Sequence, residues 1–179
     1  MIEPPGRCAK LPRMSCTVRP VKTSDLDELE DLLGAAGWET SAAQIESGLD
    51  TYDVYVALDT KDRIIGMLEG RFDSLYEDDY APCVLTYPQA WISLMTVDKF
   101  SRHKGVGRAL LRRFAQDART VHEREYLSLA VEQGEDDSGR IAFFSRCGFR
   151  TIHLEPGVYH VMGAPLSEVA VEHPPVSPL

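Results

Sequence analysis

The residues between Val97 and Leu110 combine two glycines with several basic side chains. A buried strand is predicted to end at Val97, and an amphipathic helix is predicted to begin after Gly105. Glycines at 105 and 107 would let the backbone approach a ligand with no Cβ in the way. The unpaired amides of a first helical turn point at such a ligand, and the helix dipole favours negative charge. The segment therefore predicts a cradle for a phosphate or pyrophosphate.

Two well-known phosphate cradles do not fit this segment. The dinucleotide fingerprint G-x-G-x-x-G fails, because position 110 is leucine rather than glycine. The P-loop pattern G-x-x-x-x-G-K-[ST] occurs nowhere in the chain. The alternative that stays open is a tight helix entry on a solvated basic face, with no ligand.

The whole segment resembles motif A of the Gcn5-related N-acetyltransferases, in which a strand is followed by [RQ]-x-x-G-x-[GA] and an amphipathic helix. Arg102, Gly105 and Gly107 stand at the motif positions. Residues 147–149, Cys-Gly-Phe, match the "GF" that follows a late helix of the family. The resemblance covers residues 16–163. It implies an α/β (α+β) fold with a mixed, mostly antiparallel sheet and flanking helices.

The resemblance also implies acetyl-CoA as co-substrate, and no metal. In the family the loop amides hold the pyrophosphate of acetyl-CoA, and the central strand contacts the pantetheine arm and the thioester. Many members have a tyrosine that protonates the departing CoA thiolate, and its place here is taken by Phe144. The expected cofactor-binding residues are Met95, Thr96, Val97, Arg102, His103, Lys104, Gly105, Val106, Gly107, Arg108 and Phe144.

Candidates for acid and base catalysis are few. Positions on the family's central strand that carry such groups align with Trp91 and Ser93, and neither is a base. A lysine-like amine has a pKa of ~10.4, so its proton needs an acceptor, reached directly or through water at Ser93, Glu69 or Glu132. Glu69 interrupts an apolar strand, although a solvent-facing carboxylate is the alternative. The candidate catalytic residues are Glu69, Ser93 and Tyr159, the last as a substitute acid or a packing residue.

The formal charge of the chain divides sharply. Its 179 residues carry 19 Lys and Arg against 28 Asp and Glu, a net charge of −9. Residues 25–81 hold 16 acidic and three basic residues, whereas residues 98–124 hold eight basic and three acidic ones. The basic part coincides with the expected phosphate loop, and the acidic part would favour a cationic amine, unless it only keeps the chain soluble. The expected substrate-binding residues are Asp73, Glu77, Asp78 and Asp79.

Composition, 44% hydrophobic and 26% charged, is that of a globular protein, and the length predicts one domain. We expect that domain at residues 16–164, between a disordered tail at 1–15 and a Pro-rich disordered tail at 165–179. No apolar run is long enough to span a membrane, and no secretory leader is visible. Four scattered cysteines and five histidines show no metal-ligand spacing. We therefore expect a cytoplasmic protein with no metal, membrane or nucleic-acid partner.

Hydrophobic periodicity predicts alternating strands and helices between the tails. A helix opened by Ser24 follows the first strand, and the strand at 90–97 is expected to be buried on both faces. The expected strands are 16–21, 52–59, 64–72, 90–97, 126–131, 150–154 and 158–162, and the expected helices begin at Ser24, 41, 106 and 140.

These inferences predict an acetyl-CoA-dependent N-acetyltransferase. Its acceptor is expected to be a primary amine of a small, cationic molecule, attacking the thioester directly in a ternary complex. Two alternatives stay open: a protein N-acetyltransferase, and a catalytically impaired acyl-CoA-binding regulatory module, which Phe144 and Ser93 favour. A homodimer stays open beside a monomer.

Overall fold

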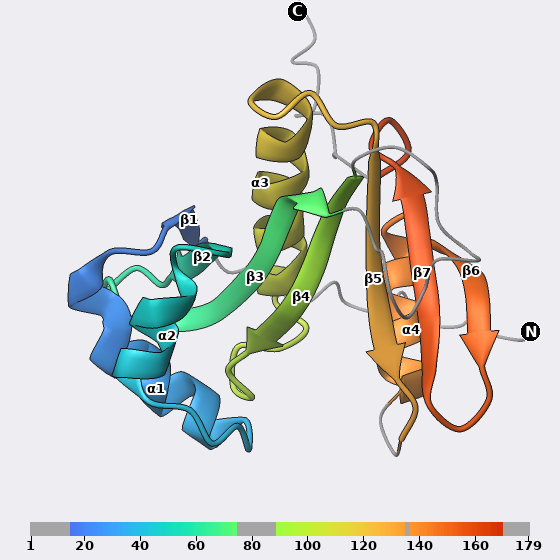
Figure 1. The fold of residues 1–179 in the computed structure, drawn as a ribbon. Helices are drawn as coiled ribbons and strands as arrows, with labels where there is room; N and C mark the ends of the chain where they lie inside the picture. Colours follow the sequence, from blue (N-terminus) through green and yellow to red (C-terminus); the bar gives the residue numbers. More distant parts are fainter. Residues whose placement is uncertain (1–14, 75–88, 135–136, 170–179) are drawn as a thin grey trace, which may run out of the picture.

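The computed structural model describes residues 15–74, 89–134 and 137–169. Seven strands form one sheet in the order β1-β2-β3-β4-β5-β7-β6, and every neighbouring pair is antiparallel except β4 and β5 (Figure 1). The strands are β1 (Thr17–Pro20), β2 (Asp53–Leu58), β3 (Ile64–Ser74), β4 (Gln89–Val97), β5 (Tyr126–Glu132), β6 (Arg150–Glu155) and β7 (Tyr159–Pro165). The expected α/β fold with a mostly antiparallel sheet is confirmed.

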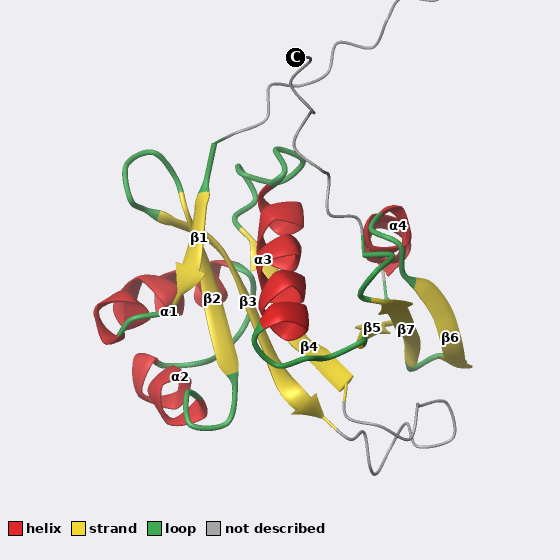
Figure 2. Cartoon of the chain, turned by 90° about the horizontal axis from the view of Figure 1, so that it is seen from above, coloured by secondary structure: helices red, strands yellow, loops and turns green. Residues whose placement is uncertain are grey.

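Helices cover both faces of this sheet, α1 and α2 on one face and α3 and α4 on the other (Figure 2). The helices are η1 (Thr23–Asp25, a 3₁₀ turn), α1 (Leu26–Ala35), α2 (Ala42–Gly48), α3 (Val106–Thr120) and α4 (Asp137–Arg146). Each face carries its own hydrophobic core. The core under α3 and α4 contains Phe114 of α3. The core under α1 and α2 contains Leu29 of α1 together with Val56 and Met67.

Strand β3 carries two glycines, Gly66 and Gly70, beneath helix α3. A Cβ on Gly66 would lie 3.2 Å from side-chain carbons of both Val106 and Leu110. A Cβ on Gly70 would lie 2.7 Å from the ring of Phe114. Side chains at these two positions would push α3 away, so the glycines set where the N-terminal end of α3 sits relative to β4.

Strands β4 and β5 pair over only three residues and then diverge. Their register runs from Ala90 beside Leu127 to Ile92 beside Leu129. In the pairing with β3, Glu69 faces Leu94 while Gly70 faces Ile92, so Ser93 forms a β-bulge. The second half of β4 therefore borders a gap on its β5 side, which Figure 1 shows as the opening between the two strands.

The expectation that the strand at 90–97 is buried on both faces is wrong for its second half. Ser93 is exposed, and Met95 and Val97 are only partly buried. The bulge also changes which residues face α3, from Ala90 and Ile92 before it to Met95 and Val97 after it. The expectation assumes strict alternation of side chains along this strand. Strict alternation does not predict a bulge or the change of face that a bulge causes.

Two local expectations also need correction. The first helix is not capped by Ser24: the chain makes a 3₁₀ turn, and the Asp25 carboxylate accepts hydrogen bonds from the backbone of Lys22 at 2.7 Å and from Arg19 at 2.6 and 2.9 Å. The Arg19 guanidinium holds the pKa of that carboxyl below its usual value. At the other end, Leu166 and Val169 are buried in the core, so packed residues extend past the expected boundary at 164.

Candidate active site

The loop between β4 and α3 is organised by the side chain of Asp98. Its carboxylate accepts hydrogen bonds from the Ser101 hydroxyl at 3.0 Å and from the Phe100 amide at 3.1 Å. The Arg102 side chain donates from Nε to the carbonyl of Val97 at 3.2 Å, which ties the loop to the end of β4. Sequence reasoning missed Asp98, although an Asp after a strand end is a common turn former.

The backbone after this turn is arranged as an open helix N-terminus. His103 and Gly105 have positive φ values of 61° and 94°, and no side chain caps the helix at Gly105. The first hydrogen bond within the helix joins the Ala109 amide to the Gly105 carbonyl at 3.0 Å. The amides of residues 106–108 therefore have no partner inside the helix, which suits an anion. The side chains of residues 102–104 are exposed beside them.

Gly107 stands at a position where the packing of the chain leaves room for a side chain. A Cβ added there would lie 3.4 Å from the ring of Phe143 and 3.7 Å from the Met95 methyl group, which are ordinary contacts. The protein's own packing therefore does not require glycine at 107, whereas the positive φ of Gly105 does favour glycine there. The arrangement fits a group that approaches the first turn of α3 from outside.

The expected acetyl-CoA-binding residues fall into two groups. Met95, Thr96 and Val97 form the edge of β4 along the gap, and the loop at 102–108 follows directly. The structure thus brings both stretches together, and Phe143 of α4 lies next to Gly107 in this region. Phe144 is elsewhere: it is buried in the core, edge-on to Phe149 at 5.5 Å between ring centroids.

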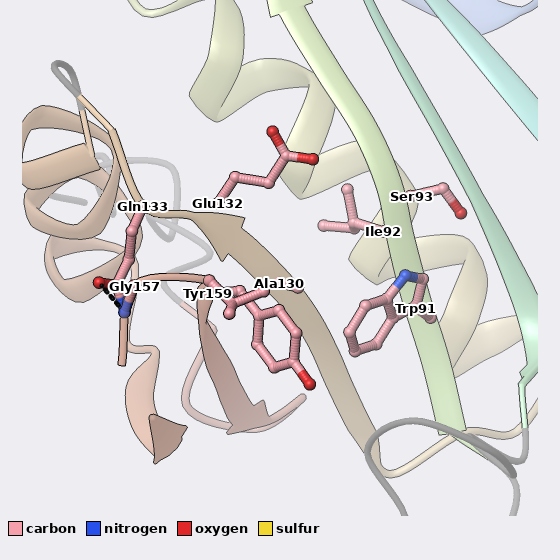
Figure 3. A pocket seen from close by; sticks show the side chains of 9 residues that line it. Trp91, Ile92, Ser93, Ala130, Glu132, Gln133, Gly157 and Tyr159 are labelled. Atoms are coloured by element: carbon pink, nitrogen blue, oxygen red, sulfur yellow. Dashed lines mark hydrogen bonds between the residues drawn. The ribbon is translucent and has the colours of Figure 1, made fainter. Parts of the chain in front are cut away.

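A pocket of about 510 Å³ lies where β4 and β5 separate. Figure 3 shows the rings of Trp91 and Tyr159 reaching into the space between the strands, with the Glu132 carboxylate nearby. Ser93 and Tyr159, two of the expected catalytic residues, line this pocket. Among the described lining residues Glu132 alone is charged. The lining residues are Trp91, Ile92, Ser93, Ala130, Glu132, Gln133, Gly157, Val158 and Tyr159.

Glu69, the third expected catalytic residue, lies one strand away from the pocket. It faces Val54 of β2 and Leu94 of β4, which both belong to the core under α1 and α2. The side chain is half-buried, and burial raises the pKa of its carboxyl. No hydrogen bond or ion pair between described residues involves Glu69, so its negative charge is not neutralised there. A carboxylate in such surroundings has an increased affinity for a proton.

The expected substrate-binding carboxylates are tested only in part. Asp73 is exposed near the end of β3 and lies 3.3 Å from Nε of Arg71, outside the pocket. Glu77, Asp78 and Asp79 fall outside the described residues. The carboxylate that the structure brings to the pocket is Glu132 instead. The sequence pointed to Glu132 only as a proton acceptor and not as a substrate-binding residue, because it lies at the end of a strand far from the acidic segment at 25–81.

Neither metal nor membrane features stand out in the described part of the chain. Among residues 15–74, 89–134 and 137–169, no three His, Cys, Asp or Glu side chains are grouped as metal ligands would be. None of the helices in these ranges combines the length and the apolar character that crossing a membrane needs.

Comparisons with known proteins agree on one family. Residues 23–149 match the family model described as Acetyltransferase (GNAT) family. No curated protein matches the chain.

Similar solved structures include a GNAT-family acetyltransferase from Desulfovibrio desulfuricans, 15% identical over 85% of this chain and 99% of that one, with a TM-score of 0.66. Arabidopsis thaliana NAA60, solved with a bisubstrate analogue, is 14% identical over 84% of this chain and 98% of that one, with a TM-score of 0.66. A Vibrio cholerae spermidine N-acetyltransferase SpeG chimera with hSSAT is 15% identical over 86% of this chain and 97% of that one, with a TM-score of 0.61. At these identities the structures show the shared fold.

Proposed function

The chain belongs to the GNAT acetyltransferase family, and we propose that it transfers an acetyl group from acetyl-CoA to a primary amine of a small, cationic molecule. The observation that carries this proposal is the gap between β4 and β5. It has an uncapped helix N-terminus beside one end and a pocket between its two strands, in which Glu132 alone among the described lining residues is charged. An anionic co-substrate and a cationic acceptor would thus meet at the bulge of Ser93.

The residues around the gap fit acetyl-CoA, which supplies an acetyl thioester to the reaction. The amides of residues 106–108 would hold its pyrophosphate, with the side chains of His103 and Lys104 exposed beside them. The edge of β4 at Met95, Thr96 and Val97 would pair with the amides of the pantetheine arm, as an added strand would. Gly107 supports this assignment, because the packing of the chain itself does not exclude a side chain there.

The proposed transfer is a direct attack in a ternary complex. The amine nitrogen forms a bond to the thioester carbonyl carbon, the carbon–sulfur bond breaks, and CoA leaves as a thiolate. Because a thiol has a pKa of ~8.5, the thiolate is an adequate leaving group. The transfer can therefore proceed without a tyrosine at position 144. Tyr159, which lines the pocket, is our candidate to donate a proton to it.

We assign the general base to Glu69, with Ser93 as a relay. The raised pKa of Glu69 supports this role, because it brings the proton affinity of the carboxylate closer to the working pH. Since Glu69 does not line the pocket, the proton would reach it through water bound at the exposed Ser93. An ammonium loses two protons when it becomes an amide: one would end on Glu69 and the other, through Tyr159, on the CoA thiolate, so that the charges balance.

For the acceptor we favour a cationic amine of small size. The volume of the pocket is within the ~300–1,000 Å³ typical of small-molecule sites. Glu132 supplies a negative charge, and the faces of Trp91 and Tyr159 offer cation–π contacts to an ammonium group. Asp73 stays a more distant candidate. The similarity to a spermidine N-acetyltransferase is compatible with this class, whereas the similarity to NAA60 keeps a protein acceptor as the alternative.

The test is the release of CoA thiol from acetyl-CoA in the presence of an amine panel. The panel should contain linear diamines, neutral amino sugars, lysine peptides and peptides with free N-termini. We expect turnover with the diamines and little with the peptides. Turnover with peptides only would favour a protein acetyltransferase, and CoA binding without any turnover would favour a regulatory module.

A further inference from the structure

Gln133, the residue after β5, holds the turn between β6 and β7. Its side-chain Nε2 donates to the carbonyl of Glu155 at 2.9 Å, and its Oε1 accepts from the amide of Gly157 at 2.9 Å. Its backbone amide donates to the carbonyl of Val158, also at 2.9 Å. One residue thus binds three of the four positions of the turn, and Figure 3 shows the bond to Gly157.

Apart from Gln133, the turn is held at its ends by the pairing of Glu155 with Tyr159 and of Tyr159 with Glu132. Residues 155–158 are all exposed, and Val158 keeps 50% of its surface accessible. One internal hydrogen bond, from the amide of Val158 to the carbonyl of Glu155 at 3.0 Å, closes the turn. Among the described residues, every side-chain hydrogen bond to its backbone comes from Gln133. Without that side chain the turn would lose both side-chain hydrogen bonds and keep backbone contacts, namely those of Gln133 and Val158 and the pairing of Glu155 with Tyr159.

The same turn forms one wall of the pocket. Gly157, Val158 and Tyr159 line it on one side, and residues 91–93 of β4 line it on the other. The position of the turn therefore sets the width of the space between them. Both polar groups of the Gln133 side-chain amide are hydrogen-bonded to the turn. The neighbouring residue Glu132 is therefore the one we expect to contact a cationic ligand in this pocket.

We propose that Gln133 is a positioning residue that sets acceptor specificity by holding the 155–158 turn as the outer wall of the pocket. This inference rests on the proposed function, because it assumes that the amine enters this pocket. A loosened wall would widen the pocket. Small amines would then bind more weakly, whereas bulkier amines would lose less of their binding affinity. The acetyl-CoA loop at 102–108 belongs to other elements, so binding of that co-substrate would not change.

The experiment compares Gln133→Ala and Gln133→Glu with the wild type. The glutamate keeps an acceptor for the Gly157 amide but places a carboxylate oxygen against the Glu155 carbonyl, so it tests the clamp with little change of shape. Gln116→Ala, at an exposed position of α3, is the matched control. Steady-state KM values for the best amine and for acetyl-CoA, and amide hydrogen exchange at residues 156–158, are measured for each protein.

Loss of both side-chain hydrogen bonds in Gln133→Ala predicts a rise of about tenfold in the KM for a small amine, and Gln133→Glu, which loses only the bond to Glu155, should show a smaller rise. The KM for acetyl-CoA should change less than about twofold, and the amides of Gly157 and Val158 should exchange faster. The control should match the wild type. An unchanged amine KM with faster exchange would overturn the inference, as would a raised amine KM with unchanged exchange, which would mean that Gln133 contacts the acceptor itself.

Failure of the proposed function would be visible separately. If the wild type turns over no amine, the same proteins are compared by calorimetric binding of the amine panel in the presence of CoA. Weaker binding of small amines to both Gln133 variants would still support the proposal that Gln133 holds the outer wall of the pocket. Equal binding to all of the proteins, or no binding to any of them, would overturn the inference.

Discussion

Gly70 lies so close to Trp91 that a Cβ on the glycine would be 2.2 Å from the tryptophan's carbonyl oxygen. The contact occurs beside the bulge at Ser93, where β4 begins to leave β5. The glycine therefore lets β3, β4 and α3 meet at the point where the gap opens. The shape of the proposed active site depends on this contact, although Gly70 itself does not line the pocket.

Replacement of Gly70 by alanine should destabilise the fold. The added methyl group must displace backbone and the ring of Phe114, which predicts a loss of about 2 kcal/mol or more in the free energy of unfolding. Urea denaturation measures it. The control is Gly34→Ala in α1, where a Cβ meets nothing within 4 Å and a gain of up to about 1 kcal/mol is expected. Equal stability of the two variants would contradict this account of the contact.

Replacement of Gly107 by alanine should separate folding from binding. Since the methyl group makes only ordinary contacts in a helical first turn, stability should be unchanged or rise by up to about 1 kcal/mol. Affinity for CoA should fall at least about tenfold, because the Cβ would stand where the ligand approaches the backbone. Titration calorimetry with CoA measures this change. Undiminished affinity would place the pyrophosphate away from Gly107.

Replacement of Glu69 by glutamine should remove the general base. The expected loss in kcat is about 10²- to 10⁴-fold, with the KM for acetyl-CoA nearly unchanged. Residual activity should also lose the acidic limb of its pH profile, because the group that titrates there is gone. Glu46→Gln, on the exposed side of α2, is the control and should behave as the wild type. A kcat close to that of the wild type would assign the base elsewhere.

The raised pKa of Glu69 also predicts how stability depends on pH. In the folded state burial disfavours the ionised form, so this residue stabilises the fold most below its unfolded-state value near 4.5. That contribution is lost as the pH rises from there through the folded-state pKa, and it stays lost above it. Glu69→Gln should therefore be more stable than the wild type at pH 7, and the difference should shrink at pH 4. Urea denaturation at both pH values tests the sign, and a variant that is less stable at pH 7 would contradict it.

The glycine-containing loop and the start of α3 could be predicted because their determinants are contiguous. Glycines 105 and 107, the basic residues around them and the stripe of α3 lie within a short stretch of chain, and local rules of helix termini connect them. The order of strands and helices follows from local periodicity in the same way, and their ends differ by only a few residues. Here local preference and tertiary structure agree.

The pocket could not be predicted, because its walls come from distant parts of the chain. Trp91 and Tyr159 meet only when β4 and β7 are placed on either side of β5. The bulge at Ser93 lies beside the close approach of Gly70 to Trp91 and Phe114, which come from other parts of the chain. The burial of Val169 was missed because prolines around it were read as a sign of disorder, while the packing that covers it is not local.

In the proposed function a cationic amine is acetylated beside Glu132. The most direct measurement is the kcat/KM for a linear diamine with acetyl-CoA, in the wild type and in Glu132→Gln, with a neutral amino sugar as the reference acceptor. We predict that the wild type prefers the diamine. In Glu132→Gln the kcat/KM for the diamine should fall about tenfold or more, whereas the kcat/KM for the amino sugar should change little. An equal loss on both acceptors, or no loss on the diamine, would contradict the account.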